Sequence, residues 1–142
     1  MKLSRILVAV DGSGCADRAF HQVMELARQS GAKVHVVSVV QPPPAVGYPK
    51  EFAIQLDQIL RRHANEVLEK YSGVAESDYD MKVEAIVQVG HPAKVILDVA
   101  KSRDVDLIAV GARGLSGIKE LFLGSVSHAV VRGSKVPVLV VK

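Results

Sequence analysis

Four glycines, one arginine and a closing serine lie within residues 111–125, which read GARGLSGIKELFLGS and follow an apolar run. A second polar turn, Asp11-Gly12-Ser13-Gly14, follows another apolar run near the start of the chain. Glycine lets a backbone come close to a bulky anion and adopt positive φ, and the first N–H groups of a helix attract negative charge. Ser125 is predicted to be the N-cap of the helix that follows. The two stretches therefore predict cradles for phosphate groups.

The common phosphate and catalytic motifs do not fit these stretches. Ile118-Lys119 follows Gly117 where a P-loop needs Lys-Ser or Lys-Thr, and Asp17 occupies the third glycine position of a dinucleotide fingerprint. The five histidines show no metal-ligand spacing, and no G-x-S-x-G nucleophile elbow occurs. Asp11 is the one acid placed to hold a metal or polarise a water beside phosphates, which is thin support for catalysis. The pattern favours a binding site.

Two further residues with reactive side chains receive ordinary structural interpretations. His128 lies three residues after Ser125, and a helix-surface or satisfied core histidine is favoured over a catalytic one because nothing nearby is a nucleophile. Cys15 is favoured as a small buried residue over an oxidant sensor. It is the only cysteine, so no intramolecular disulfide can form.

Short runs rich in Val and Ile alternate with helical patterns along the chain. Strands are predicted at residues 5–10, 33–40, 82–89, 106–110 and 137–141, and helices at 15–30, 52–71, 92–102 and 125–132. In the second helix the predicted inner face comprises Leu56, Ile59, Leu60, His63, Val67 and Leu68. The order β-α-β-α-β-α-β-α-β predicts an α/β fold with a mostly parallel sheet and helices on both faces. Ligands of such sheets bind beyond the carboxyl ends of the strands, where both glycine-rich turns fall.

Composition limits the possible partners. The 142 residues, 49% hydrophobic with six aromatic side chains, predict one domain over residues 1–142. No apolar run approaches the ~20 residues of a membrane-spanning helix, so we expect a cytoplasmic protein without a membrane partner. The net charge is only +3 and aromatic side chains that could stack on bases are scarce, so we expect no nucleic-acid partner.

The glycine spacing resembles that of a known family. Gly111, Gly114 and Gly124-Ser125 are similar to the G-x2-G-x9-G-(S/T) signature of the nucleotide-binding branch of the universal stress protein family. The stretches RILVAVDGS, GLSGIKELFLGSVSHAVV and PVLVV also resemble it. The resemblance implies a doubly wound, Rossmann-like sheet of five parallel strands in the order 3-2-1-4-5. It further implies binding of ATP with Mg²⁺, a homodimer, and a role in stress tolerance.

The resemblance also assigns a role to each matching residue. Asp11 corresponds to the acid near adenine and ribose, with a possible indirect contact to Mg²⁺ through the nucleotide, and Val39 to the residue whose backbone lies by the adenine edge. Gly111, Arg113 and Gly114 correspond to the loop over ribose and phosphates. Gly124, Ser125 and Val126 correspond to the turn that holds the triphosphate. Ala112 replaces the frequent Ser or Thr, which removes one hydroxyl contact.

Three functions remain open from the sequence. The first is a nucleotide-binding regulatory module, and the second is an enzyme that hydrolyses ATP, at most slowly. The third is an interaction protein whose glycines only shape a turn. Residues 137–141 form an apolar strand near the C-terminus with no later element to cover it, so a homodimer through this strand is expected.

Overall fold

The computed structural model describes residues 2–42, 47–114 and 123–142. Strands and helices alternate along the described chain as the sequence predicts. The strands are β1 (Arg5–Ala9), β2 (Lys33–Val40), β3 (Glu84–Val89), β4 (Leu107–Gly111) and β5 (Val138–Val141); the helices are α1 (Gly14–Ser30), α2 (Lys50–Tyr79), α3 (Pro92–Ser102) and α4 (Ser125–Gly133).

The five strands form one parallel sheet in the order β3-β2-β1-β4-β5. This arrangement confirms the doubly wound fold expected from the sequence and the resemblance. The winding direction reverses between β1 and β4, which pair in the register Ile6↔Leu107. Because all strands run the same way, their carboxyl ends meet along one edge of the sheet.

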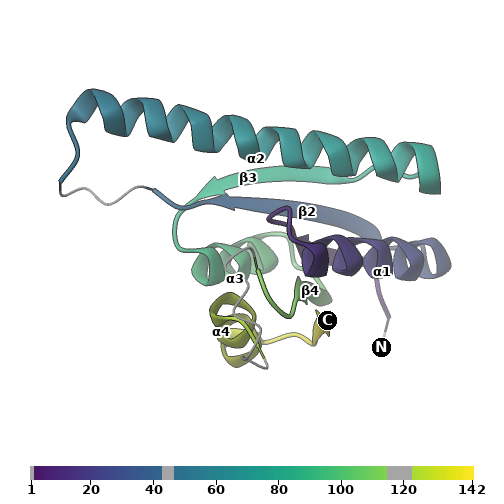
Figure 1. Ribbon diagram of the computed structural model, residues 1–142. Helices are drawn as coiled ribbons and strands as arrows, with labels where there is room; N and C mark the ends of the chain where they lie inside the picture. Colours follow the sequence, from purple (N-terminus) through teal and green to yellow (C-terminus); the bar gives the residue numbers. More distant parts are fainter. Residues whose placement is uncertain (1, 43–46, 115–122) are drawn as a thin grey trace.

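Helices cover both faces of the sheet, as Figure 1 shows. On one face, side chains of β1 and β2 pack with those of α1 and α2 around Phe20, Met24 and Tyr71. On the other face, Leu7, Val37 and Ile108 pack with α3 and α4. Val and Ile dominate the central strands because both faces of a parallel sheet are buried.

Helix α2 departs most from the prediction. It spans 30 residues, and its amino-terminal half extends past the ends of β2 and β3 (Figure 1). Its four buried residues, Ala64, Leu68, Tyr71 and Ala75, all lie from the middle of the helix onward. The predicted inner face is therefore wrong at Ile59, which is 60% exposed, and at His63, which is also exposed. The apolar periodicity of the sequence continues along α2 past the end of the sheet, where no described strand is present to bury the apolar side chains.

No described helix is both long enough and apolar enough to cross a membrane. The proline-rich segment at residues 41–50 lies partly outside the described residues. Gly117 lies wholly outside them.

Candidate functional site

A cavity of about 670 Å³ lies at the carboxyl edge of the sheet, where the winding direction reverses. We call it the carboxyl-edge cavity. All eight residues predicted for a nucleotide site line it, although they come from four separate stretches of the chain: Asp11, Val39, Gly111, Arg113, Gly114, Gly124, Ser125 and Val126. Its volume is within the range of small-molecule sites.

The turn between β1 and α1 is held by a short chain of hydrogen bonds. The Ser13 N–H donates to Asp11 Oδ1 at 2.9 Å, and Ser13 Oγ accepts from the Ala16 N–H at 3.2 Å. Ser13 is therefore the N-cap of α1. Gly12 has a φ of +86°, which only glycine adopts readily, so this turn requires it. The result fixes the Asp11 carboxylate at the mouth of the cavity.

Gly111 lines the cavity and also packs closely against the start of α1. A Cβ at this position would lie 2.7 Å from Cys15 Cβ and 2.8 Å from the Ala16 nitrogen. The end of β4 thus touches the first turn of α1, and no larger residue fits there. The glycine at 111 is explained by packing of strand on helix, which in turn brings the α1 N-terminus to the cavity.

The carbonyl of Ala112 joins the two parts of the glycine signature. It accepts a 2.6 Å hydrogen bond from the Gly124 N–H and a 2.8 Å hydrogen bond from Ser127 Oγ. Ala112 itself is 2% exposed. These bonds hold the first turn of α4 against the turn after β4. A hydroxyl at position 112 is not needed for this link, because the backbone carbonyl makes it.

The predicted N-cap of α4 is wrong by one residue. Gly124 is the N-cap and Ser125 is the first helical residue, and no side chain of the described residues caps this helix. The sequence favoured Ser125 because serine is a common N-cap. Ser125, Val126 and Ser127 all line the cavity, so the N-terminus of α4 faces it with the positive end of its dipole.

Arg113 and Gly114 complete the predicted loop. Arg113 is half-buried, lines the cavity, and has no hydrogen-bond or ion-pair partner among the described residues. A Cβ at Gly114 would lie 2.8 Å from Asp11 Oδ2, so the turns after β1 and β4 touch. A carboxylate and an unpaired guanidinium therefore border the same cavity, and the guanidinium is available to an anion.

Several cavity residues were not predicted from the sequence. Ser38 is only 5% exposed, lines the cavity, and its hydroxyl has no hydrogen-bond partner among the described residues. Leu60, His63, Ala64 and Val67 of α2 form a wall, and His91 at the N-cap of α3 forms another part. No local motif marks these positions. Only the pairing of β2 and the placement of α2 bring them to the site.

One titratable group behind the site is strongly perturbed. Burial raises the pKa of the Tyr71 phenol, and the carboxylates of Asp17 and Asp11 raise it further because they oppose a second negative charge. Tyr71 is 2% exposed and packs against Phe20. The phenol is therefore neutral across the physiological pH range.

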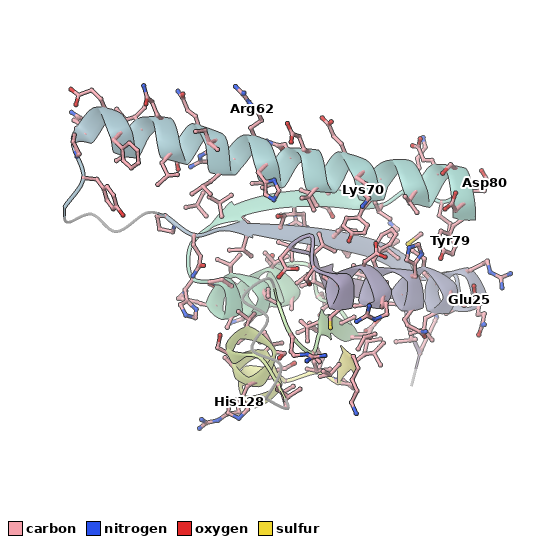
Figure 2. All side chains as sticks on the ribbon, in the orientation of Figure 1. Glu25, Arg62, Lys70, Tyr79, Asp80 and His128 are labelled. Carbon is pink, nitrogen blue, oxygen red and sulfur yellow. The ribbon has the colours of Figure 1, made fainter. Side chains whose placement is uncertain are left out.

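The remaining sequence predictions concern reactive side chains. Cys15 is buried, as expected. His128 lies on the exposed surface of α4 and points away from the sheet (Figure 2), which agrees with the helix-surface interpretation. Within residues 2–42, 47–114 and 123–142, no three His, Cys, Asp or Glu side chains are grouped to hold a metal ion. Asp11 is thus the only metal contact predicted in the cavity. A metal ion there would need further oxygen atoms from a bound ligand.

Comparison with known proteins identifies related chains over nearly the whole length. The model of the universal stress protein family matches residues 2–142. The universal stress protein YxiE of Bacillus subtilis is 34% identical over 147 residues, covering 98% of this chain and 99% of that protein. A universal stress protein of Archaeoglobus fulgidus, solved in complex with dAMP, is 28% identical with a TM-score of 0.73 and full coverage of both chains. A universal stress protein solved in complex with cAMP is 25% identical with a TM-score of 0.77, covering 100% of this chain and 99% of that one.

Proposed function

This chain belongs to the universal stress protein family, and from that membership we propose that it binds ATP with Mg²⁺ in the carboxyl-edge cavity. The bound nucleotide makes the protein a regulatory module in stress tolerance, not a catalyst of a metabolic step. The single observation that supports this most is that eight residues predicted from four separate stretches all line one cavity.

The chemistry of the cavity suits a nucleotide. Its polar end combines the α4 N-terminus with the unpaired guanidinium of Arg113, and both attract phosphate groups. The other end contains Val37, Val39 and Val40 of β2 with Leu60 and Val67 of α2. A flat apolar base with hydrogen-bonding edges fits between such side chains. Two relatives have been solved with adenine nucleotides, dAMP and cAMP, which supports an adenine ligand.

Magnesium enters with the nucleotide in this proposal. Mg²⁺ prefers oxygen ligands and commonly uses one or two carboxylates together with substrate phosphates. Asp11 supplies one carboxylate at the cavity mouth, where Ser13 N–H holds one of its oxygens. The phosphates and water supply the other ligands, so the ion has no site of its own before the nucleotide binds.

Mass spectrometry of small molecules released from natively purified protein tests the proposal. We expect about one adenine nucleotide per chain, and titration calorimetry of the stripped protein should show that ATP binds more tightly with Mg²⁺ than without it. An empty protein that takes up no ATP at saturating concentration supports the interaction-protein hypothesis instead.

Slow ATP hydrolysis is the second candidate function, because Asp11 lies where it could polarise a water beside the phosphates. No second carboxylate lines the cavity among its described residues, so a turnover far below the ~1 s⁻¹ of dedicated enzymes is expected. Two results together would replace the regulatory proposal with an enzymatic one. The wild type would have to release phosphate at several turnovers per second, and an Asp11→Asn variant purified in the same way would have to be inactive.

A further inference from the structure

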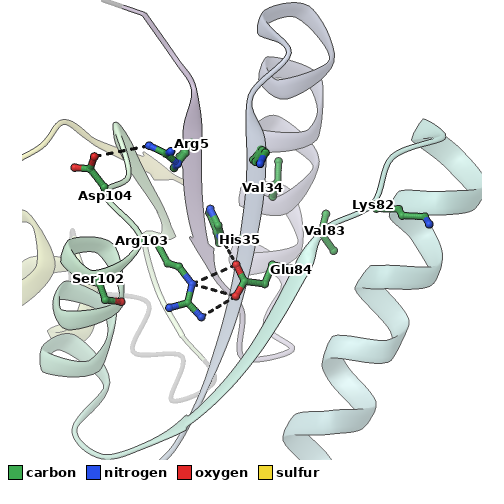
Figure 3. A pocket seen from close by; sticks show the side chains of 10 residues that line it. Arg5, Val34, His35, Lys82, Val83, Glu84, Ser102, Arg103 and Asp104 are labelled. Carbon is green, nitrogen blue, oxygen red and sulfur yellow. Dashed lines mark hydrogen bonds and ion pairs between the residues drawn. The ribbon is translucent and has the colours of Figure 1, made fainter.

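A second cavity, also of about 670 Å³, lies at the opposite edge of the sheet, where β1, β2 and β3 begin. Figure 3 shows its side chains. We call it the amino-edge cavity. Charged groups reach it from every neighbouring element: Arg5 of β1, Lys33 and His35 of β2, Lys82 and Glu84 at the start of β3, and Arg103 and Asp104 after α3.

Glu84 is the centre of this cluster and its charge is already compensated. The Glu84 Oε2 atom lies 2.6 Å from His35 Nδ1. The Glu84 Oε1 atom accepts two hydrogen bonds from Arg103, one from Nε at 3.0 Å and one from Nη2 at 2.7 Å. The hydrogen bonds from Arg103 lower the pKa of Glu84, and the His35 hydrogen bond lowers it further. Because the carboxylate is ionised and only accepts, His35 Nδ1 carries the proton and donates it.

The other ring nitrogen of His35 is left without a partner. Nε2 is buried and makes no hydrogen bond in the described structure, and the His35 side chain is only 9% exposed. Neutral His35 thus buries an unpaired acceptor, and protonated His35 would bury an unpaired N–H donor. Either state carries the desolvation cost of an unsatisfied polar atom, so a partner that reaches Nε2 would stabilise the site.

Cations exceed carboxylates around this nitrogen. Four cationic side chains line the cavity against the two carboxylates of Glu84 and Asp104. Arg5 lies 3.7 Å from Asp104, whose side chain is 95% exposed, so water screens that pair strongly. Lys33 and Lys82 have no ion-pair or hydrogen-bond partner among the described residues. The uncompensated charge at this edge is positive.

We propose that the amino-edge cavity binds a tetrahedral oxyanion group, as in phosphate or a phosphate monoester, and that binding takes up one proton at His35 Nε2. The oxyanion then accepts the Nε2–H bond and lies beside Arg5 and Lys33, which line the same cavity. Figure 3 shows His35 between Arg5 and Glu84. The long side chain of Arg5 is 46% exposed, so it can move to admit the anion.

The surrounding charges couple the two events. Because His35 Nδ1 already donates to Glu84, an Nε2–H donor is present only when both ring nitrogens carry protons. A bound dianion accepts from that donor and attracts Arg5 and Lys33 at the same time. Protonation requires falling pH, so the oxyanion affinity rises as pH falls. This inference is independent of nucleotide binding at the other edge.

Sulfate is the probe for the test, because its charge is constant across the pH range in which histidine titrates. NMR titrations would follow the His35 ring and the amides of Lys33 and Glu84. We expect sulfate to bind about tenfold or more tightly at about pH 6 than at about pH 8. The His35→Gln variant should lose this pH dependence, and Arg5→Gln should bind more weakly at both pH values. Arg62→Gln is the matched control, since Arg62 points away from the sheet on the outer side of α2 (Figure 2).

Each other outcome has a definite meaning. Shifts confined to residues 111–114 and 123–126 would overturn the proposal, because sulfate would then occupy only the carboxyl-edge cavity. Affinity that does not change with pH, or that Arg5→Gln leaves unaltered, would also overturn it. If sulfate binds as expected, titrations with inorganic phosphate and glycerol 3-phosphate identify the source of the oxyanion. A tighter monoester indicates that an organic group fills the rest of the cavity, and equal affinities indicate a free ion.

Discussion

The Gly124 N–H donates a 2.6 Å hydrogen bond to the carbonyl oxygen of Ala112, and a Cβ at position 124 would lie 3.3 Å from that same oxygen. The contact fixes the start of α4 against the turn after β4. A Cβ at position 124 would therefore be in tight contact with the turn after β4. A longer side chain there must extend into the carboxyl-edge cavity or displace that turn.

Gly124→Glu should abolish ATP binding while leaving the fold intact. The new carboxylate would lie among the anionic groups of the nucleotide, and like charges at ~4 Å repel by about 4 kcal/mol at an effective dielectric near 20, or roughly a thousandfold in affinity. The φ of Gly124 is −68°, which every residue tolerates, so backbone strain is not expected. Titration calorimetry with a circular dichroism control measures both effects. Gly124→Ala is the matched control for bulk alone, and wild-type affinity in a folded Gly124→Glu protein would place the phosphate site elsewhere.

Ser38→Ala should weaken nucleotide binding but not binding of the phosphate chain. The Ser38 hydroxyl is unpaired among the described residues and lines the cavity from β2, which is separated by β1 from β4, the strand before α4. Loss of one hydrogen bond costs ~1 kcal/mol, so ATP affinity should fall roughly two- to tenfold. Competition binding would compare ATP with inorganic triphosphate in both proteins. Equal losses for the two ligands would contradict a contact to the base or ribose.

If the chain dimerises through β5, as expected from the sequence, Val140→Pro should convert that dimer into a monomer. The Ile108 N–H donates to the Pro137 carbonyl at 3.1 Å, and the Ala112 N–H donates to the Val141 carbonyl at 2.7 Å. The backbone N–H and C=O groups of the odd-numbered residues in β5 therefore point toward β4. Alternation then directs the Val140 N–H away from the sheet, toward any partner strand. Proline removes that donor and keeps the pairing with β4. Light scattering should give a dimer mass for the wild type and for Val140→Thr. A wild-type monomer at micromolar concentration would rule out the proposed homodimer.

Arg103→Gln should lower stability at neutral pH more than at acidic pH. The hydrogen bonds from Arg103 lower the pKa of Glu84 below the 4.5 of an unperturbed glutamate, so the pair stabilises the fold above that value and the contribution is lost as pH falls through the lowered pKa. The effect is expected to be small because the Glu84 side chain is 43% exposed and water screens the pair. Urea unfolding near pH 7 and near pH 3 measures the difference. An equal loss at both pH values would mean that Arg103 contributes through packing and not through charge.

The sequence predicts the fold well where local chemistry and tertiary burial agree. The bounds of β2 and α3 match the prediction fully, because β2 is an unbroken run of strand-forming residues buried on both faces and Pro92 marks the start of α3. The last turns of α2 were missed after Tyr71. Gly73 lies on the exposed side with nothing near its Cβ position, so it costs only helix propensity, while Ala75 two residues later is fully buried.

The site was predictable only in part, for a related reason. Glycine spacing marks backbone that must approach a ligand or another element, and the sequence cannot distinguish the two cases. Gly111 also packs on Cys15 and Ala16, a contact that the glycine spacing does not reveal. Ser38 carries no local signal, since its exposure to the cavity depends on which face of β2 it occupies. The partnerless Nε2 of His35 likewise results from residues far apart in sequence, Glu84 and Arg103, that meet only in the folded chain.

The part of α2 that extends beyond the sheet would make the affinity for the proposed nucleotide adjustable from a distance. Buried contacts anchor the helix only from Ala64 onward, and a free helical segment of about a dozen residues is marginal in water. Leu60 and His63, which form part of the cavity wall, lie in that marginal segment. For the proposed nucleotide ligand, any fraying of this segment would reduce the fraction of binding-competent molecules, and the apparent dissociation constant scales inversely with that fraction. A change at an outward position such as Gln58 can then tighten or loosen binding through helix propensity alone, without touching the ligand.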